Sequence, residues 1–193
     1  MDLFDILQFI PPIIILAAIV GVVFLVINVR RRRSRVDTGI GTVRRLYFYS
    51  VSFVALMMVA SGVMLVGMDL LDRLFADSAV SDSTTRLAWG LALIIVGLPL
   101  WVLHWRAMTG HVAKNAVETQ SEIRKIYLHL VIGVALIFMV IGAFTGLEQV
   151  FNTEDFKGFS WAAVIVWSAV WALHWRIDTG EGHPTPETLG IRR

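Results

Sequence analysis

Long apolar segments constrain the fold of this chain more than any other feature. Five stretches of mostly hydrophobic residues each approach the roughly 20 residues that an α-helix needs to cross the hydrocarbon of a bilayer. They cover about residues 9–29, 46–68, 87–105, 126–147 and 159–175. Hydrophobic residues make up 56% of the 193 residues and charged residues only 17%, which is more apolar than a soluble domain requires. The sequence therefore predicts an all-α membrane protein with five transmembrane helices.

Basic residues are distributed unevenly among the segments that separate these spans. Fourteen of the 17 Lys and Arg residues lie after the first span, between the third and fourth spans, or after the fifth. The opposite side holds only Arg73, Arg86 and Lys157. Because cytoplasmic segments carry the excess of Lys and Arg, we expect the N-terminus outside and the C-terminus in the cytoplasm. The N-terminal residues lack the basic leader of a cleavable signal peptide, so we interpret the first span as a retained anchor.

Two parts of the chain repeat each other. Residues 101–110 and 171–180 match at seven of ten positions, and the start of the second span, residues 44–47, has a counterpart in residues 124–127. Each copy contains two spans, so both copies cross the membrane in the same sense. A parallel repeat of this kind implies a pseudo-two-fold axis along the membrane normal. The expected fold is a tandem repeat of two helical hairpins with pseudo-two-fold symmetry, plus one N-terminal anchor helix.

These features divide the chain into five segments. We expect an anchor helix with a basic cytoplasmic linker over 1–43, the first hairpin over 44–110, a cytoplasmic linker over 111–123, the second hairpin over 124–176 and a flexible cytoplasmic tail over 177–193. Small residues four apart predict faces where helices approach closely. The pairs are Ala17 with Gly21, Ala88 with Ala92, Gly142 with Gly146, and Ser168 with Ala172.

The repeated motif places two tryptophans, a histidine and an arginine at the inner end of one span in each copy. Tryptophan rings favour the headgroup level of a membrane, and arginine side chains extend toward the phosphates from just below it. Both preferences are met at this position without any ligand. The main interpretation is therefore a set of interfacial anchors, consisting of Trp101, Trp105, Arg106, Trp171, Trp175 and Arg176.

The histidines of the motif allow a second interpretation. Ionisable residues within a membrane are candidates for function, and the repeat relates His104 to His174. Two neutral imidazoles from different helices are suitable axial ligands for the iron of haem b, and His129 near the start of the fourth span is a third candidate. A third possibility is a pocket between the repeats for a lipid headgroup, a quinone or another small ligand, lined by the motif residues and by Tyr47, Tyr49 and Tyr127. The main interpretation requires no cofactor.

Several other classes of site find no support. The chain has no cysteine, which excludes disulfides, thiolate metal sites and cysteine nucleophiles. It has no phosphate-binding loop, zinc signature or nucleic-acid module. The serines Ser50, Ser52 and Ser61 have no acid or histidine on their own helix, and we expect their hydroxyls to bond back to helix carbonyls. We predict no catalytic residue and no metal site.

The paired segments Arg-Arg-Leu-Tyr and Leu-His-Trp-Arg resemble those of a bacterial family of multi-span membrane proteins that carry a domain of unknown function. In that family an Arg-[Leu/Ile]-Tyr start and a Trp-x-Leu-His-Trp end bracket a two-helix module. The resemblance covers about residues 44–106 and 124–176. It implies a bacterial inner membrane and brings no particular activity.

The expected function is that of a non-enzymatic integral membrane protein, a subunit or scaffold that contacts lipid and packs against other membrane helices. Its partners are then other membrane subunits or further copies of itself, and nucleic acid is not among them. The alternative is a haem b-binding or quinone-binding electron-transfer subunit that uses His104 and His174. A small channel or transporter is the third class, although no charged residue at mid-depth favours it.

Overall fold

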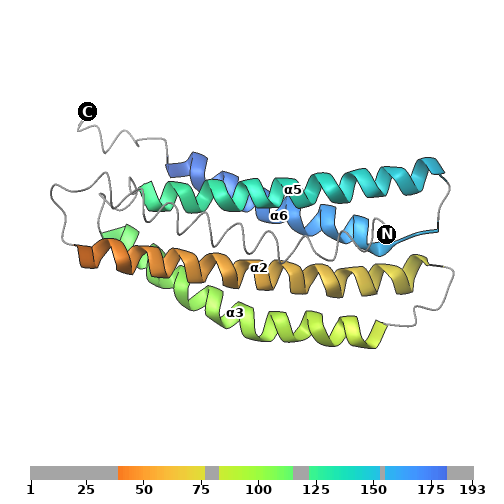
Figure 1. Ribbon diagram of the computed structural model, residues 1–193, viewed down its shortest axis with the longest axis horizontal. Coiled ribbons are helices and arrows are strands. Elements are labelled where there is room, and N and C mark those ends of the chain that lie inside the picture. Colours follow the sequence, from red (N-terminus) through yellow and green to blue (C-terminus); the bar gives the residue numbers. More distant parts are fainter. Residues whose placement is uncertain (1–38, 77–82, 115–121, 153–154, 182–193) are drawn as a thin grey trace, which may run out of the picture. The chain divides into compact units, whose positions relative to one another are not determined.

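A computed structural model describes residues 39–76, 83–114, 122–152 and 155–181 (Figure 1). These ranges contain four helices: α2 over Gly39–Phe75, α3 over Ser83–Lys114, α5 over Glu122–Asn152 and α6 over Gly158–Glu181. They contain no strand, which confirms the all-helical fold class for the described part of the chain. The first expected span, about residues 9–29, lies outside the described residues together with Ala17 and Gly21.

All four helices are long and apolar enough to cross a membrane. The candidate spans are Val43–Phe75, Thr84–Gly110, Ile123–Asn152 and Gly158–Thr179. Each helix runs beyond the apolar stretch that the sequence marks. Hydropathy identifies only the part that fits hydrocarbon, whereas backbone hydrogen bonding continues a helix into the polar layer. We call the end that carries the α2–α3 and α5–α6 connections the outer end, after the orientation predicted from the basic residues.

Helices α2 and α3 are antiparallel and lie side by side (Figure 1). Glycines set their distance. A Cβ atom placed on Gly62 would come within 2.7 Å of the Gly90 carbonyl oxygen, and one on Gly97 would come within 2.9 Å of the Met58 Cβ. Because any larger residue would collide with the facing helix, these two glycines allow the close approach.

Helices α5 and α6 form a second antiparallel pair (Figure 1). A Cβ atom on Gly142 would come within 2.9 Å of both the Ser160 carbonyl oxygen and the Ala163 Cβ. Phe138 stacks on the fully buried Trp167 with ring centroids 4.5 Å apart. The pair is therefore held by a close glycine contact near its outer end and by stacked aromatic rings farther inward.

The two pairs also contact each other, and the helical part from Arg45 onward forms one compact unit. Near the inner end, Tyr49 on α2 packs against Tyr127 on α5 with ring centroids 5.4 Å apart. Near the outer end, a Cβ on Gly67 of α2 would lie 3.7 Å from the Ala162 Cβ of α6, an ordinary packing distance. Helix α3 takes the smallest part in this core: 11% of its most apolar window is buried, against 28–33% for the other three helices.

Candidate functional site

The two copies of the motif lie at the inner ends of α3 and α6 and adopt the same local geometry. The tryptophans of each copy stack on one another, with ring centroids 5.9 Å apart for Trp101 and Trp105 and 5.6 Å apart for Trp171 and Trp175. Both motif arginines are exposed. The interfacial role of these six residues stays a prediction, because it depends on where the membrane boundary lies.

All three candidate histidines are tied to their own helix by one ring nitrogen. The Nδ1–H groups donate to the carbonyl oxygen four residues earlier, at 2.7 Å for His104, 2.7 Å for His129 and 2.9 Å for His174. A carbonyl oxygen accepts only, so Nδ1 carries the proton in this arrangement. The other nitrogen, Nε2, is thereby left as the atom that meets a ligand or a second hydrogen-bond partner.

The surroundings of the motif histidines differ. His104 is half-buried and lies against Tyr47 and Phe48 of α2, with ring centroids 5.9 and 5.7 Å apart. His174 is fully buried, and its ring centroid lies 6.1 Å from those of both Trp105 and Tyr127.

The three histidines proposed as axial ligands have different neighbours. Among the ring contacts of the described residues, none joins His104 to His174. His129 is exposed on α5. Each histidine thus has its own environment rather than a shared one, although the Nδ1 arrangement is common to all three. The part of the chain that the structure describes also contains no group of three or more His, Asp or Glu side chains able to hold a metal ion.

A cluster of buried polar atoms surrounds Tyr127 at the inner end. The Tyr127 hydroxyl lies beside the side chains of Ser52 and Trp101 without meeting hydrogen-bond geometry with either. The His174 ring contacts the Tyr127 ring. Sequence reasoning set Ser52 aside because its own helix offers it no partner. Its polar neighbours come instead from α3 and α5, which no local pattern reveals.

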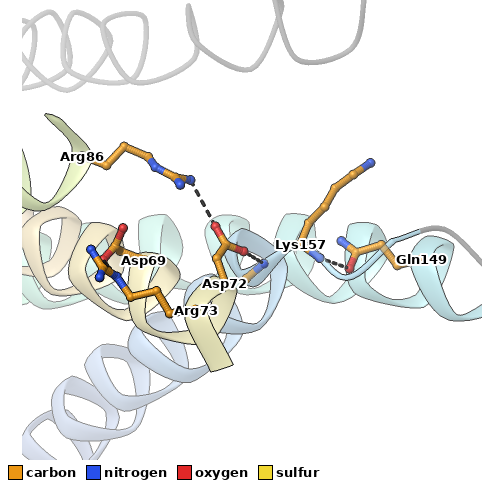
Figure 2. A network of polar contacts seen from close by, with 7 residues as sticks. Asp69, Asp72, Arg73, Arg86, Gln149 and Lys157 are labelled. Carbon is orange, nitrogen blue, oxygen red and sulfur yellow. Dashed lines mark hydrogen bonds and ion pairs between the residues drawn. The ribbon is translucent and has the colours of Figure 1, made fainter. Parts of the chain in front are cut away.

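A second polar site, at the outer end, is centred on Asp72 of α2 (Figure 2). One carboxylate oxygen accepts a hydrogen bond of 2.6 Å from the backbone N–H of Gly158, the first residue of α6. The other accepts a 3.1 Å bond from the Arg86 guanidinium of α3. A carboxylate at a helix N-terminus satisfies a free N–H group and complements the helix dipole. Asp72 therefore connects α2 with α3 and α6, and its side chain is only 9% exposed.

Glycine at position 158 is required for this arrangement. A Cβ atom there would come within 2.6 Å of the Met68 carbonyl oxygen and 2.8 Å of the Asp72 Oδ1. The start of α6 thus lies directly against the outer turns of α2. One turn closer to the inner end of α2, Asp69 accepts a 2.8 Å bond from Arg73, whose side chain is 55% exposed.

Uncharged side chains complete the outer site (Figure 2). Gln149 donates to the Ser160 hydroxyl at 2.7 Å, and its carbonyl oxygen accepts from the backbone N–H of Lys157 at 3.1 Å. The hydroxyl of Thr145 lies 2.9 Å from that of Ser160. The sequence patterns did not predict this network.

One comparison with known proteins identifies the family. A family model described as Domain of unknown function (DUF5671) matches residues 45–155, more than half of the chain. The match takes in most of α2 and all of α3 and α5, and ends just before α6 begins. No curated protein and no solved structure matches the chain. The expected relationship to a family of unknown function is thus confirmed: the chain belongs to the DUF5671 family.

Proposed function

We propose that this protein is a non-enzymatic subunit of the bacterial inner membrane that associates through its helix α3. The observation that carries the proposal is the unequal burial of the four helices. Only 11% of the α3 window is buried, whereas the other helices bury about three times as much. Among the described helices, α3 therefore buries the least of its surface and keeps the most for contact with a further helix.

The face of α3 that points away from α2 carries small residues suited to helix contact. Ala88 and Ala92, four residues apart, are both exposed, while Gly90 and Gly97 on the opposite side are buried against α2. Small residues at this spacing let helix backbones approach closely in lipid, where van der Waals packing drives association. By contrast, Gly142 and Gly146 of α5 already lie against α6.

The partner we propose for this face is α3 of a second copy of the chain. Two identical faces brought together by a two-fold axis form a closed dimer, which is the commonest symmetric assembly. The alanines then meet their own counterparts across the axis. A small-residue pair on each side gives both helices the same close approach.

The test uses the absence of cysteine from the chain. Ala88→Cys and Ala92→Cys proteins are oxidised in native membranes and separated without reductant. Ala143→Cys is the matched control, because Ala143 is an exposed alanine of α5 and lies as many residues from the outer end of its helix as Ala92. We expect a disulfide-linked dimer with one or both α3 variants and none with the control. Equal dimer in all three, or a strictly monomeric mass in lipid nanodiscs with no dimer at all, contradicts the proposal.

The proposal includes duplication of a helical hairpin. Contacts that support it occur at corresponding positions of the two halves. Gly62 meets Gly90 in the first pair and Gly142 meets Ser160 in the second. The contact of Tyr47 with His104 likewise corresponds to that of Tyr127 with His174. Together with the basic residues, these correspondences favour two hairpins of equal orientation with the motifs on the cytoplasmic side.

A second candidate function, binding of haem b by His104 and His174, is favoured by one observation. The Nδ1 nitrogen of each ring is held by a carbonyl, which leaves Nε2 as the coordinating atom. The visible spectrum of protein purified from haem-sufficient cells separates the two candidates. Under our proposal the spectrum shows no Soret band. A stoichiometric Soret band that disappears in either His104→Ala or His174→Ala would establish the haem function instead.

A further inference from the structure

Four buried polar atoms at the inner end come from four different helices. They are the Ser52 hydroxyl of α2, the Trp101 indole nitrogen of α3, the Tyr127 hydroxyl of α5 and the Nε2 of His174 on α6, and none has a hydrogen-bond partner among the described protein atoms. Ser52 and His174 are 0% exposed and Tyr127 is 4% exposed. Buried polar groups are almost always hydrogen-bonded, because burial removes their bonds to water.

Tyr127 connects the members of this cluster. Its hydroxyl lies beside Ser52 and Trp101, and its ring packs on that of His174. The Trp105 ring also contacts two of its members, with its centroid 6.4 Å from that of Tyr127 and 6.1 Å from that of His174. Tyr127 thus relates all four side chains to one another, through its hydroxyl to Ser52 and Trp101 and through its ring to His174.

The hydrogen-bonding chemistry of the cluster selects its ligand. The Trp101 indole N–H donates only, whereas Nε2 of a neutral His174 accepts only, since its Nδ1–H already donates to the Val170 carbonyl oxygen. Serine and tyrosine hydroxyls do both. A cation is disfavoured because the Trp101 N–H directs its positive end into the cluster. An anion without a proton is disfavoured because it cannot donate a hydrogen bond to the His174 Nε2. A neutral O–H group can accept a hydrogen bond from Trp101 and donate one to His174 at the same time.

We propose that Ser52, Trp101, Tyr127 and His174 form an internal binding site for a neutral hydroxyl group. The group accepts a hydrogen bond from Trp101 and donates one to His174, with the other two hydroxyls completing its shell. Two sources carry this chemistry: a buried water molecule, which needs two to four polar partners, and the hydroxyl head of a lipid-soluble quinol. The site is independent of the α3 interface proposed above.

The repeat relates these four residues to a second set, Ile132, Trp171, Tyr47 and His104, which lacks the same features and provides internal controls. Tyr47, the counterpart of Tyr127, is 57% exposed. His104 is half-buried and Trp171 is not among the buried unpartnered groups. Position 132, the counterpart of Ser52, is isoleucine.

The first measurement is the sign of a stability change in the full chain in lipid nanodiscs. If the cluster binds a hydroxyl group, Tyr127→Phe removes a partner of that ligand and lowers the melting temperature. If the cluster is dry, the same change deletes an unsatisfied hydroxyl and leaves the melting temperature unchanged or raises it. Ser52→Ala obeys the same logic and replaces Tyr127→Phe should that variant not fold. Tyr47→Phe is the control and is expected to have no effect.

The second measurement identifies the ligand. Protein labelled with 15N-tryptophan is examined by NMR, with Trp101→Phe to assign the indole and Trp171 as the control indole. A cross-peak between the Trp101 N–H and water, with no quinol in a solvent extract, supports the site with water as its ligand. About one quinol extracted per chain, and lost in Tyr127→Phe, supports it with quinol. If Trp101 contacts neither water nor quinol, or if Tyr127→Phe and Ser52→Ala do not lower the melting temperature, the proposal is wrong.

Discussion

At the residue scale, the outer end of the bundle depends on one carboxylate. Asp72 is 7% exposed and accepts hydrogen bonds from the Gly158 backbone and the Arg86 side chain. Its negative charge serves both contacts, since it pairs with a cation and lies at the N-terminus of α6. The neighbouring pair of Asp69 and Arg73 spans a single helical turn and has an exposed cation.

We predict that Asp72→Asn lowers the free energy of unfolding by about 2 kcal/mol, the usual value for a hydrogen bond to a charged group. The amide keeps the size of the side chain but removes the charge that Arg86 and the helix N-terminus require. Denaturant unfolding in detergent micelles measures the change. Arg73→Gln is the comparison, and we expect it to cost less than Asp72→Asn, because the Arg73 side chain is 55% exposed and the glutamine amide can still donate a hydrogen bond to Asp69. A larger loss for Arg73→Gln than for Asp72→Asn would reverse this ranking.

Burial also separates the two motif histidines. His174→Ala removes a fully buried ring and should cost about 3 kcal/mol, in the range of large-to-small changes in a core. His104→Ala removes a half-buried ring and should cost about 1 kcal/mol, close to the value of one hydrogen bond. The same unfolding assay measures both. Equal costs would mean that the two environments do not differ as described.

At this scale the repeated motif could be found from the sequence, but the burial of individual polar side chains could not. The motif residues were recognised because a repeat is visible in the sequence itself. Asp69 and Asp72 are 3% and 7% exposed, although no pattern in the sequence marks either carboxylate as buried. The N–H group that Asp72 accepts belongs to Gly158, 86 residues away. No pattern along the chain indicates that such distant positions meet.

At the element scale, glycines fix the separation of the helices within each pair. Gly62 and Gly142 each lie against backbone atoms of the facing helix, at distances that leave no room for a methyl group. Gly133, also on α5, has nothing within 4 Å of an added Cβ. The same residue type therefore has opposite roles at two positions of one helix.

This contrast predicts opposite effects for two alanine substitutions in α5. Gly142→Ala should destabilise the bundle by about 1–3 kcal/mol, as expected for overpacking. Gly133→Ala should be neutral or stabilise it by up to about 1 kcal/mol, because alanine has the higher helix propensity. Melting temperatures of the two variants decide the matter. Similar melting temperatures for both would show that the α5–α6 contact is not close at Gly142.

Hydropathy predicted the four described spans because the cost of an unsuitable residue in hydrocarbon is large and local. The ends of the helices were harder to predict. Helix α2 extends over Gly39–Phe75, well past the expected residues 46–68, and its outer end carries the Asp72 contacts, which hydropathy does not measure. Helix α6 likewise continues to Glu181. The pairing of the helices could not be predicted from the glycines alone, because a glycine marks a close contact only once the facing helix is known.

At the scale of the whole molecule, the four helices alternate in direction and bring both motifs to the inner end. The contacts of Trp105 on α3 with Tyr127 and His174 of the other pair show that the inner ends meet. The outer ends meet through Asp72 and Gly158. The motif arginines therefore lie at one end of the bundle, and the buried carboxylates of Asp69 and Asp72 lie at the other.

The central claim is that these helices span a membrane with both motifs on the cytoplasmic side. Single cysteines test it, because the native chain has none. Four positions with exposed residues serve: Thr84 and Asp155 at the outer end, and Gly110 and Thr179 at the inner end. Each is treated in intact cells, and again after permeabilisation, with a membrane-impermeant maleimide. We predict labelling of the two outer cysteines in intact cells and of the two inner cysteines only after permeabilisation. Labelling of Gly110→Cys or Thr179→Cys in intact cells would contradict the account.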